Sequence, residues 1–467
     1  MKMWSGRFSQ PLDPGFDRWQ RSFRFDRRLL PEEIAASRVY AEALAGAGIL
    51  STGELKTIVR GLEKIEEKAA EDPSVVESSE AEDVHHFVEQ QLAQASGEVA
   101  YKLHTGRSRN EQVATDLRLF ARKSIDDIRA GLAAFIDVLR ARASELGDAA
   151  MPAYTHLQRA EPVLAAHWML AYAEMFFRDA ERLADCRKRV NVLPLGSGAV
   201  AGAMLALDRS AMAKKLGFAR ISGNSMDATS DRDFILEFLN ALAFVGLHLS
   251  GWAEEMVLFS TAEFGFVRSP EKFATGSSSM PQKKNPDAME LLRGQAGGVI
   301  AAGVALSMTI KGLPLAYNKD LQETQEPLFE ATDTITKGLH VATQFLQAVE
   351  FNREQMSKAA TSGFLNATAA ANYLVSQGVP FRHAHAAVGK AVQHCMARGC
   401  ELESLSLKEL QHFNSEFKEE VRNWLTLEAV LAAHDVHGGT APIRVQQALV
   451  DARARLAELR KEASAHA

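Results

Sequence analysis

Cysteine is scarce in this chain, with three among 467 residues: Cys186, Cys395 and Cys400. Their spacing matches no metal-ligand or redox motif. So few thiols in so long a chain indicate a reducing compartment, where disulfides do not persist. We therefore expect a cytoplasmic protein in which Cys395 and Cys400 are plain buried or half-buried thiols.

Basic charge is not in excess either, since 53 Lys and Arg face 59 Asp and Glu, for a net charge of −6. Without a basic surplus to neutralise phosphates, neither nucleic acid nor a membrane surface is an expected partner. The most apolar stretches, 199–207 and 297–308, fall short of the roughly 20 apolar residues that span a bilayer. The first eight residues contain no apolar segment typical of a targeting signal.

Proline is absent from three long intervals: Pro73 to Pro152, Pro194 to Pro270, and Pro327 to Pro380. In the first interval, apolar residues recur at helical spacing from Val113 to Leu139. Runs of alternating β-branched residues are almost absent. The pattern therefore predicts an all-α protein whose long helices pack side by side in a bundle. Beyond the helix of the first interval, we expect helices from Pro162 to about Val190 and over 230–264, 286–309 and 325–349.

The distribution of long helices predicts three mostly helical domains. Residues 1–106 hold shorter helical pieces, residues 107–360 the central long-helix bundle, and residues 361–467 short helices again. The long helices exceed what one chain needs to cover itself, so we expect their apolar faces to form the core of a tetramer. A single self-contained helical domain is the alternative.

The segment Gly276–Asp287 has an unusual composition, with three serines, two prolines, two lysines and an asparagine after the glycine. Such a loop could close over an anionic substrate, with a serine oxygen taking a proton and lysines holding a carboxylate. The same residue types also make ordinary solvated loops.

Two other segments carry polar groups beside predicted helices. In 103–112, Gly106 allows a turn, and Arg107 and Arg109 flank Ser108 where a helix begins, which makes a ready anion site. Ser108 could equally be only an N-cap. In 154–162, a hydroxyl and the imidazole of His156 stand just ahead of a helix, although a lone loop histidine is more often solvated or capping.

In their order along the chain, the three segments resemble active-site regions of the argininosuccinate lyase family, within the fumarase/aspartase superfamily. The matching runs are HTGRSRN, THLQRA and GSSSMPQKKNPD. The resemblance extends nearly end to end. Further elements that match the family pattern are Trp4–Phe8, Glu82–His85, Pro194–Ala199, Ser230–Phe234, Tyr317–Glu323 and Gly438–Pro442.

The resemblance implies reversible β-elimination of argininosuccinate to arginine and fumarate, without metal or organic cofactor, in a homotetramer whose sites are shared between subunits. It assigns Ser277 as the base that removes a proton beside a carboxylate. Lys283 and Asn285 would hold the substrate carboxylates. His156 would assist proton transfer to the leaving nitrogen, and Glu290 would pair with that histidine.

The resemblance also implies substrate-binding residues along the whole chain. A carboxylate suits the guanidinium end of the substrate, which needs an anionic or bidentate partner. The N-terminal positions that match contacts to that end are Ser22, Asp26 and Asp83. The remaining positions that match substrate-binding residues are Ser108, Arg109, Asn110, Thr155, Tyr317 and Gln322.

Three residues depart from the family pattern in ways that bear on the site. Glu111 stands where the family usually has Asp, and Glu161 where it usually has Gln. Gln325 replaces a common Lys, so a charged donor becomes a neutral one, at a cost of roughly 1 kcal/mol or more. We expect weaker substrate binding or a compensating cation, with the same chemistry.

Two alternative functions remain open from the sequence. One is a sister fumarate-releasing lyase acting on aspartate, malate or adenylosuccinate; the doubled Lys283-Lys284 and the run 317–323 speak against it. The other is a non-enzymatic, crystallin-like family member, which the intact Ser277, His156, Lys283 and Glu290 disfavour.

Overall fold

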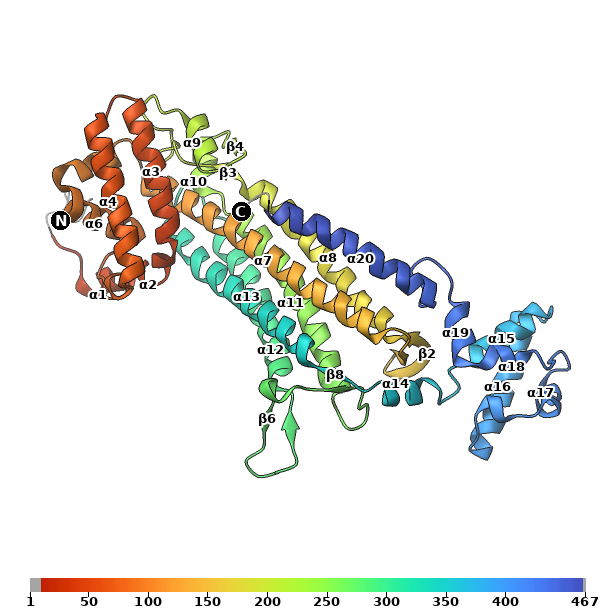
Figure 1. Ribbon diagram of the computed structural model, residues 1–467. Helices are drawn as coiled ribbons and strands as arrows, with labels where there is room; N and C mark the ends of the chain where they lie inside the picture. The colour runs from red at the N-terminus through yellow and green to blue at the C-terminus, as the bar shows by residue number, and fades with distance from the viewer. Residues whose placement is uncertain (1–9, 465–467) are drawn as a thin grey trace. The chain divides into compact units, whose positions relative to one another are not determined.

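The computed structural model describes residues 10–464, so the opening motif Trp4–Phe8 lies outside the described residues. The chain divides into two compact units, each described by itself. Figure 1 shows the helices and strands along the chain. Among the described residues, the first unit contains 10–127, Arg182–Ala243 and Gly298–Thr334. The second contains Ile128–Glu181, Phe244–Gly297 and 335–464. The three-domain division along the sequence remains a prediction.

Helices make up most of the described chain. They are α1 (Pro14–Trp19), α2 (Phe23–Asp26), η2 (Arg27–Leu29), α3 (Leu30–Gly46), α4 (Thr52–Glu71), α5 (Ser74–Glu77), α6 (Val84–Ser96), η3 (Gly97–His104), α7 (Arg109–Leu146), α8 (Ala165–Val190), α9 (Arg209–Lys215), α10 (Ser225–Ser230), α11 (Asp233–Phe259), η4 (Glu271–Phe273), α12 (Asp287–Ile310), η5 (Lys319–Thr324), α13 (Gln325–Ala348), α14 (Arg353–Ala360), α15 (Ala367–Ser376), α16 (Phe381–Arg398), η6 (Leu402–Ser404), α17 (Leu407–Phe413), α18 (Val421–Leu425), α19 (Leu427–Ala433) and α20 (Pro442–Ser464).

Strands in the described chain form only two-stranded sheets. Antiparallel pairs join β1 (Ala150–Thr155) to β2 (Gln158–Leu164), β5 (Val267–Arg268) to β8 (Glu350–Phe351), and β6 (Thr275–Gly276) to β7 (Lys284–Asn285). A parallel pair joins β3 (Val192–Leu193) to β4 (Arg220–Ile221). The all-α fold class predicted from the proline spacing is confirmed.

Two predicted helices have wrong boundaries. The helix expected over 230–264 corresponds to α11, which runs from Asp233 to Phe259, and the other is the helix expected at Pro162. The helix expected from Pro162 begins at Ala165, because 150–164 forms the β1–β2 hairpin, in which Pro152 faces Pro162. Neither proline can donate a backbone hydrogen bond, and both suit a short ribbon with a free edge. The hairpin lacks the alternating β-branched residues from which strands are predicted in a sequence.

In the first unit, aromatic packing fixes the N-terminal segment beside α6. Phe23, which begins α2, stacks on Phe87 of α6 with 5.1 Å between ring centroids. Both rings are buried. Burying one such side chain contributes roughly 1.5–3 kcal/mol. Ser22 and the amino-terminal end of α6 are therefore held close together.

In the second unit, an aromatic cluster joins four long helices. Phe135 of α7 meets Phe176 of α8 and Trp252 of α11 edge to face, at 5.0 and 5.2 Å between centroids. Trp252 also meets Phe345 of α13 at 6.0 Å. All four side chains are fully buried. Edge-to-face contacts between rings add directional attraction to the apolar burial, so this cluster holds the bundle in register.

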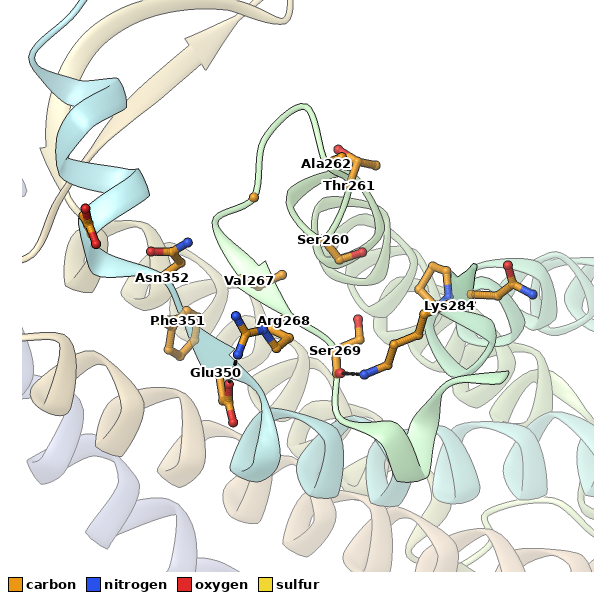
Figure 2. A pocket seen from close by; sticks show the side chains of 14 residues that line it. Ser260, Thr261, Ala262, Val267, Arg268, Ser269, Lys284, Glu350, Phe351 and Asn352 are labelled. Carbon is orange, nitrogen blue, oxygen red and sulfur yellow. Dashed lines mark hydrogen bonds and ion pairs between the residues drawn. The ribbon is translucent and has the colours of Figure 1, made fainter. Parts of the chain in front are cut away.

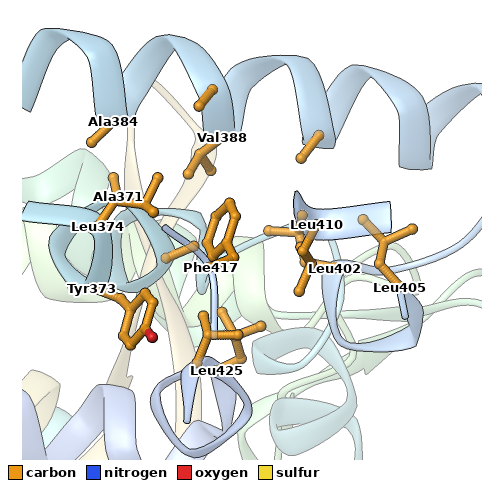
Figure 3. Packing of buried hydrophobic residues seen from close by; sticks show 14 of the residues in the cluster. Ala371, Tyr373, Leu374, Ala384, Val388, Leu402, Leu405, Leu410, Phe417 and Leu425 are labelled. Carbon is orange, nitrogen blue, oxygen red and sulfur yellow. The ribbon is translucent and has the colours of Figure 1, made fainter. Parts of the chain in front are cut away.

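The short helices near the C-terminus have a hydrophobic cluster of their own (Figure 3). Tyr373 of α15 stacks on Phe417 with ring planes 2° apart. Leu374 and Val388 bring α15 and α16 into the same buried cluster, and Leu425 adds α18. A buried cluster of this kind is what allows a segment to fold as a compact subregion.

Two described helices are long and apolar enough to cross a membrane by length and composition alone. They are α11 and α12, with mean hydropathy of 1.5 and 1.3 in their most apolar windows. The expectation from uninterrupted apolar runs did not anticipate them. Core helices of soluble proteins pass the same test, and half of the α11 window is buried within the chain. The two helices are therefore weak evidence for a membrane span.

Candidate active site

The start of α7 is built by a tight turn and reciprocal capping. Gly106 has φ +72° and lets the chain turn into the helix. The backbone amide of Asn110 donates a hydrogen bond to Ser108 Oγ at 3.2 Å, and the backbone amide of Ser108 donates one to Glu111 Oε1 at 3.2 Å. Ser108 thus caps the helix, as one reading of the sequence proposed. Capping does not exclude a second role at an anion-binding helix terminus.

Glu111 ties this helix start to the Pro194–Ala199 element. Its Oε2 accepts from the amides of Gly196 at 2.6 Å and Gly198 at 3.0 Å. The Asn110 side-chain amide donates to the Ala199 carbonyl at 3.1 Å. Burial raises the pKa of Glu111, and the three backbone bonds oppose that rise. The longer side chain that replaces the family's usual Asp is therefore fully bonded.

An acidic cluster lies beside the first turn of α7. Asp26 is 3% exposed and accepts from Ser22 Oγ at 2.5 Å and the Val84 amide at 3.0 Å. Burial, together with the charge of Asp83, raises the pKa of Asp26 to about 7. Asp83 caps α6 through the His86 amide and lies 3.3 Å from Arg109 Nη1. Four predicted site residues are thus brought together: Ser22, Asp26, Asp83 and Arg109.

Tyr317 and Gln322 belong to the same unit as this acidic cluster. Burial raises the pKa of Tyr317, and the Asp83 charge adds to that rise. The side-chain amide of Gln322 donates to the Gln20 carbonyl at 3.3 Å. Gln325, the residue that replaces a lysine, is 3% exposed, and its Oε1 has no hydrogen-bond partner in the described chain.

Arg232 belongs to the element Ser230–Phe234 but has no role among the residues predicted from the sequence. Arg232 is 2% exposed, and its Nε and Nη2 have no hydrogen-bond partner among residues 10–464. Burial lowers its pKa to about 10, while Tyr317 is the charge partner that most opposes the fall. An arginine inside an otherwise acidic element was the signal that could have identified it.

Thr155 and His156 stand at the tip of the β1–β2 hairpin, not ahead of a helix as expected. Thr155 pairs with Gln158, so His156 and Leu157 form the two-residue turn. Both have left-handed backbones, with φ +54° and +56°. Hairpin turns of this kind usually contain Gly or Asn. Non-glycine residues in this conformation store strain, which is common at functional sites.

The hairpin is braced by residues far away in the sequence. Arg159 donates to the carbonyls of Ala359 and Ser362 at 3.3 Å. At the other end of β2, the Leu164 amide donates to Thr440 Oγ1 at 2.8 Å. The Gly438–Pro442 element therefore has a structural function, because it holds the base of the hairpin that presents His156.

The serine loop projects from the β6–β7 pair. Ser277 is half-buried, and its Oγ accepts from the amides of Ser279 at 3.3 Å and Met280 at 3.1 Å. Below the loop, Asp287 at the start of α12 accepts from the amide and hydroxyl of Thr275 at 2.9 and 2.7 Å. Two amide donors aimed at a hydroxyl oxygen stabilise negative charge on it.

A pocket of about 630 Å³ lies at the base of this loop (Figure 2). Asn285, Lys284 and Ser269 line the pocket. Lys284 Nζ donates a hydrogen bond to the Ser269 carbonyl at 2.6 Å. Arg268 and Glu350 form an ion pair on another side. Lys284 is thus committed to the stem, whereas Lys283 is exposed on the loop.

Glu290 is exposed on α12, and its Oε1 lies 3.8 Å from Arg293 Nη2. No hydrogen bond or ion pair joins it to His156 within the described part of the chain. Eight predicted site residues belong to the first unit and six to the second. The first group is Ser22, Asp26, Asp83, Ser108, Arg109, Asn110, Tyr317 and Gln322; the second is Thr155, His156, Ser277, Lys283, Asn285 and Glu290.

The helical bundle and the serine loop define a lyase of the fumarase/aspartase superfamily. The lyase family model matches residues 6–301, and the model for the C-terminal region of argininosuccinate lyase matches 364–432. The chain is similar to an EDDS lyase variant with bound fumarate, at a TM-score of 0.86 and 25% identity over 98% of this chain and 93% of that one.

Curated relatives narrow the class. The argininosuccinate lyase of Acidobacterium capsulatum is 56% identical, over 98% of this chain and 96% of the relative. That of Koribacter versatilis is 55% identical, over 98% of both chains. The chain belongs to the argininosuccinate lyase family.

Proposed function

We propose that this chain cleaves argininosuccinate to arginine and fumarate by β-elimination, with Ser277 as the base. The activity follows from family membership, since relatives covering nearly the whole chain are argininosuccinate lyases. The observation that supports the base is the pair of backbone amides that donate to Ser277 Oγ. Removing the proton beside a carboxylate creates a dianionic intermediate, so donors and cations must meet charge that develops late.

Closure of the loop would complete the base. A free serine hydroxyl has a very high pKa, and two amide donors alone leave it protonated at neutral pH. Lys283, exposed on the same loop, supplies a cation that can approach both the alkoxide and the substrate carboxylate once water is excluded. Asn285, on the pocket wall, would hold the other carboxylate oxygens.

The proton for the leaving nitrogen would come from the hairpin. His156 is exposed at a rigid, strained turn, so its ring can enter a substrate site without moving the hairpin. Pairing with a carboxylate would orient this ring and favour its protonated form. We assign that carboxylate to Glu290, which is exposed on α12 with its Oε1 3.8 Å from Arg293 Nη2.

The guanidinium group of the substrate would meet the acidic cluster. Asp26 and Asp83 offer two carboxylates, and Ser22 orients Asp26. Arg109 lies 3.3 Å from Asp83, so Ser108, Arg109 and Asn110 at the start of α7 would face a substrate carboxylate close to that guanidinium. Charge-assisted bonds to both groups would position the reacting carbon against the base.

We further propose a homotetramer with shared sites. Ser108–Asn110 stand where α7 begins, and Thr155 and His156 follow its other end. A helix of 38 residues is about 57 Å long, and the stretch from Gly147 to Thr155 is too short to return along it. One copy of the chain therefore cannot bring both ends of α7 to one substrate.

The exposed apolar surface supports a second copy of this chain as the partner. Along α12, Ile300, Val304 and Met308 recur every fourth residue and are 38, 57 and 67% exposed. An apolar stripe at this spacing is typical of a helix that packs against another helix. Closed symmetric assembly of identical chains would cover it.

The test of the activity is fumarate release from argininosuccinate, followed by absorbance. Aspartate, malate and adenylosuccinate serve as the comparison panel. Preference for any of these three would replace the proposal with the sister-lyase alternative, and no turnover on the panel would favour a crystallin-like role. We place the enzyme in arginine biosynthesis, in the cytoplasm.

A further inference from the structure

Three ionisable side chains that are not assigned substrate contacts meet in the interior of the first unit. They come from α3, α6 and α7: Glu33, His85 and Asp116. Glu33 is 1% exposed, His85 7% and Asp116 0%. His85 Nδ1 lies 2.8 Å from Glu33 Oε2 and 3.7 Å from Asp116 Oδ2. The ligand-type atoms of all three lie within 4.8 Å of one another.

Asp116 differs from its neighbours in having no hydrogen-bond donor. Within the described chain, neither of its carboxylate oxygens has a hydrogen-bond partner. Glu33, by contrast, accepts from Ser37 Oγ at 2.8 Å and from Gln112 Nε2 at 3.0 and 3.2 Å, besides His85. An unsatisfied buried carboxylate beside a satisfied one is costly, and a proton on the former turns it into a donor.

Electrostatics favour the same distribution of protons. Burial, then the charge of Glu33, raises the pKa of Asp116 well above its usual range. Burial alone would raise the pKa of Glu33, but His85, Arg107 and Ser37 together lower it to about 2. Burial would lower the pKa of His85, and the charge and hydrogen bond of Glu33 outweigh it and raise the pKa.

The cluster holds both substrate-binding segments of this unit. Gln112, which donates to Glu33, lies in the first turn of α7, just after Ser108–Asn110. Arg107 Nη1 donates to Ser37 Oγ at 2.8 Å and lies 3.8 Å from Glu33 Oε1. His85 is two residues after Asp83 on the same turn of α6.

We propose that Asp116 is a protonated hydrogen-bond donor to an ionised Glu33, and that this pair positions the Arg107–Asn110 and Asp83 segments for substrate. Neither residue touches substrate in this arrangement, so both are positioning residues. Their kinetic effect rests on the proposed function. The protonation state does not, because the cluster is formed by the folded chain alone.

Other charged groups face the cluster from each element around it. The charge of Glu32 on α3 also raises the pKa of Asp116. The charges of Asp83, at the start of α6, and of Asp26, on α2, raise the pKa of His85. The charge of Arg107, in the loop before α7, lowers the pKa of both Glu33 and Asp116. His104 has its pKa lowered to about 4 by burial and by Arg107, so it adds no positive charge at neutral pH.

The first test exploits the opposite requirements of the two carboxyl groups. Asp116→Asn supplies an N–H donor of the same shape, and we expect kcat/KM within about threefold of the parent enzyme. Glu33→Gln removes the charge that His85 and Arg107 need. We expect kcat/KM to fall at least about tenfold, mainly through a higher KM, as for a lost charge-assisted bond. Equal losses in the two variants, or the reverse order, would overturn the proposal.

A second test needs no substrate and stays informative if Glu33→Gln does not fold. The infrared difference spectrum of parent minus Asp116→Asn, at pH 7, should contain the carbonyl stretch of a protonated carboxyl group. Only carboxylate bands in that spectrum would refute the proton assignment, whatever the enzyme's substrate is. Elemental analysis of purified protein is the companion measurement, since a stoichiometric metal ion lost in either variant would replace the proton with a cation.

Stability against pH provides the third readout. A folded-state pKa raised above the unfolded one stabilises the fold below the unfolded pKa, and this contribution is lost as pH rises toward the folded value. As pH rises, the free energy of unfolding of the parent should therefore fall relative to that of Asp116→Asn. The slope of this fall against pH should correspond to at most one proton. Parallel curves for the two proteins would show that Asp116 is ionised.

Discussion

A serine hydroxyl becomes a base only where its alkoxide is stabilised. Whether that is so depends on the hydrogen-bond donors around the individual serine. Ser277 Oγ accepts hydrogen bonds from two backbone amides. In the described loop, no backbone amide donates a hydrogen bond to the Ser278 hydroxyl. The backbone conformation thus distinguishes two adjacent serines of identical chemistry. The sequence alone could assign the role only by resemblance.

This distinction predicts different outcomes for two neighbouring substitutions. Ser277→Ala should lower kcat for fumarate release at least about 10²-fold while leaving substrate binding largely intact, as expected for a lost base. Ser278→Ala is the matched control and should stay within a fewfold of the parent. Calorimetric titration of the Ser277→Ala protein with argininosuccinate measures the binding. Activity of Ser277→Ala within about tenfold of the parent would defeat the assignment.

Asp26 gives a pH-dependent prediction. Its pKa is raised to about 7, so its contribution to stability is present below the unfolded pKa and is lost as pH rises through about 7. Asp26→Asn should therefore be more stable than the parent at pH 8, by roughly 1 kcal/mol or more, with a smaller difference at pH 5. Thermal unfolding of both proteins at the two pH values measures this. A constant difference would show that Asp26 does not titrate in this range.

At the scale of single elements, the β1–β2 hairpin shows how the structure places a catalytic candidate. Its turn forces His156 and Leu157 into the left-handed region, and Arg159 and Thr440 hold its two ends. Leu157 is 67% exposed, so its side chain recovers little of the strain by burial. The strain is the cost of presenting His156 at a rigid tip.

Relief of that strain should be measurable. A left-handed backbone costs a non-glycine residue roughly 1–2 kcal/mol, and glycine avoids this cost. Leu157→Gly should therefore raise the melting temperature by a few degrees, whereas Leu157→Val should lower it. Differential scanning calorimetry compares the two variants with the parent. A lower melting temperature for Leu157→Gly would mean that Leu157 makes contacts worth more than the strain, for example with another subunit.

At the scale of the whole molecule, the proposed site residues divide between the two units of the chain, and α11 and α12 carry apolar surface that their own chain leaves exposed. The closed assembly proposed above would account for both observations. Neighbouring copies would cover the apolar stripes and bring the two groups of site residues together.

Subunit mixing tests this explanation. Ser277→Ala and His156→Asn chains should each be inactive alone, because every site lacks either the base or the imidazole. Under conditions of subunit exchange, some mixed assemblies should contain sites with both residues intact, and activity should return to a fraction of the parent value. The control mixes two separately purified batches of Ser277→Ala. Exchange detected by mass spectrometry without recovered activity would sink the shared-site model.

The sequence by itself determined the helical class, the extents of most long helices and the family. Those properties depend on local periodicity, proline spacing and ordered motifs, all of which are written along the chain. The interval 113–139 lies within α7, and 286–309 differs from α12 by one residue at each end.

Only the tertiary structure revealed the hairpin that carries His156, the amides on Ser277 Oγ, and the buried pair Glu33–Asp116. Each depends on contacts between residues far apart in sequence or on backbone angles that residue type does not dictate. Asp26 and Asp83 would pass for surface acids in the sequence, and burial against α6 makes Asp26 a group that titrates near neutrality. The dielectric surroundings of a carboxyl group arise from folding, so a sequence motif cannot predict them.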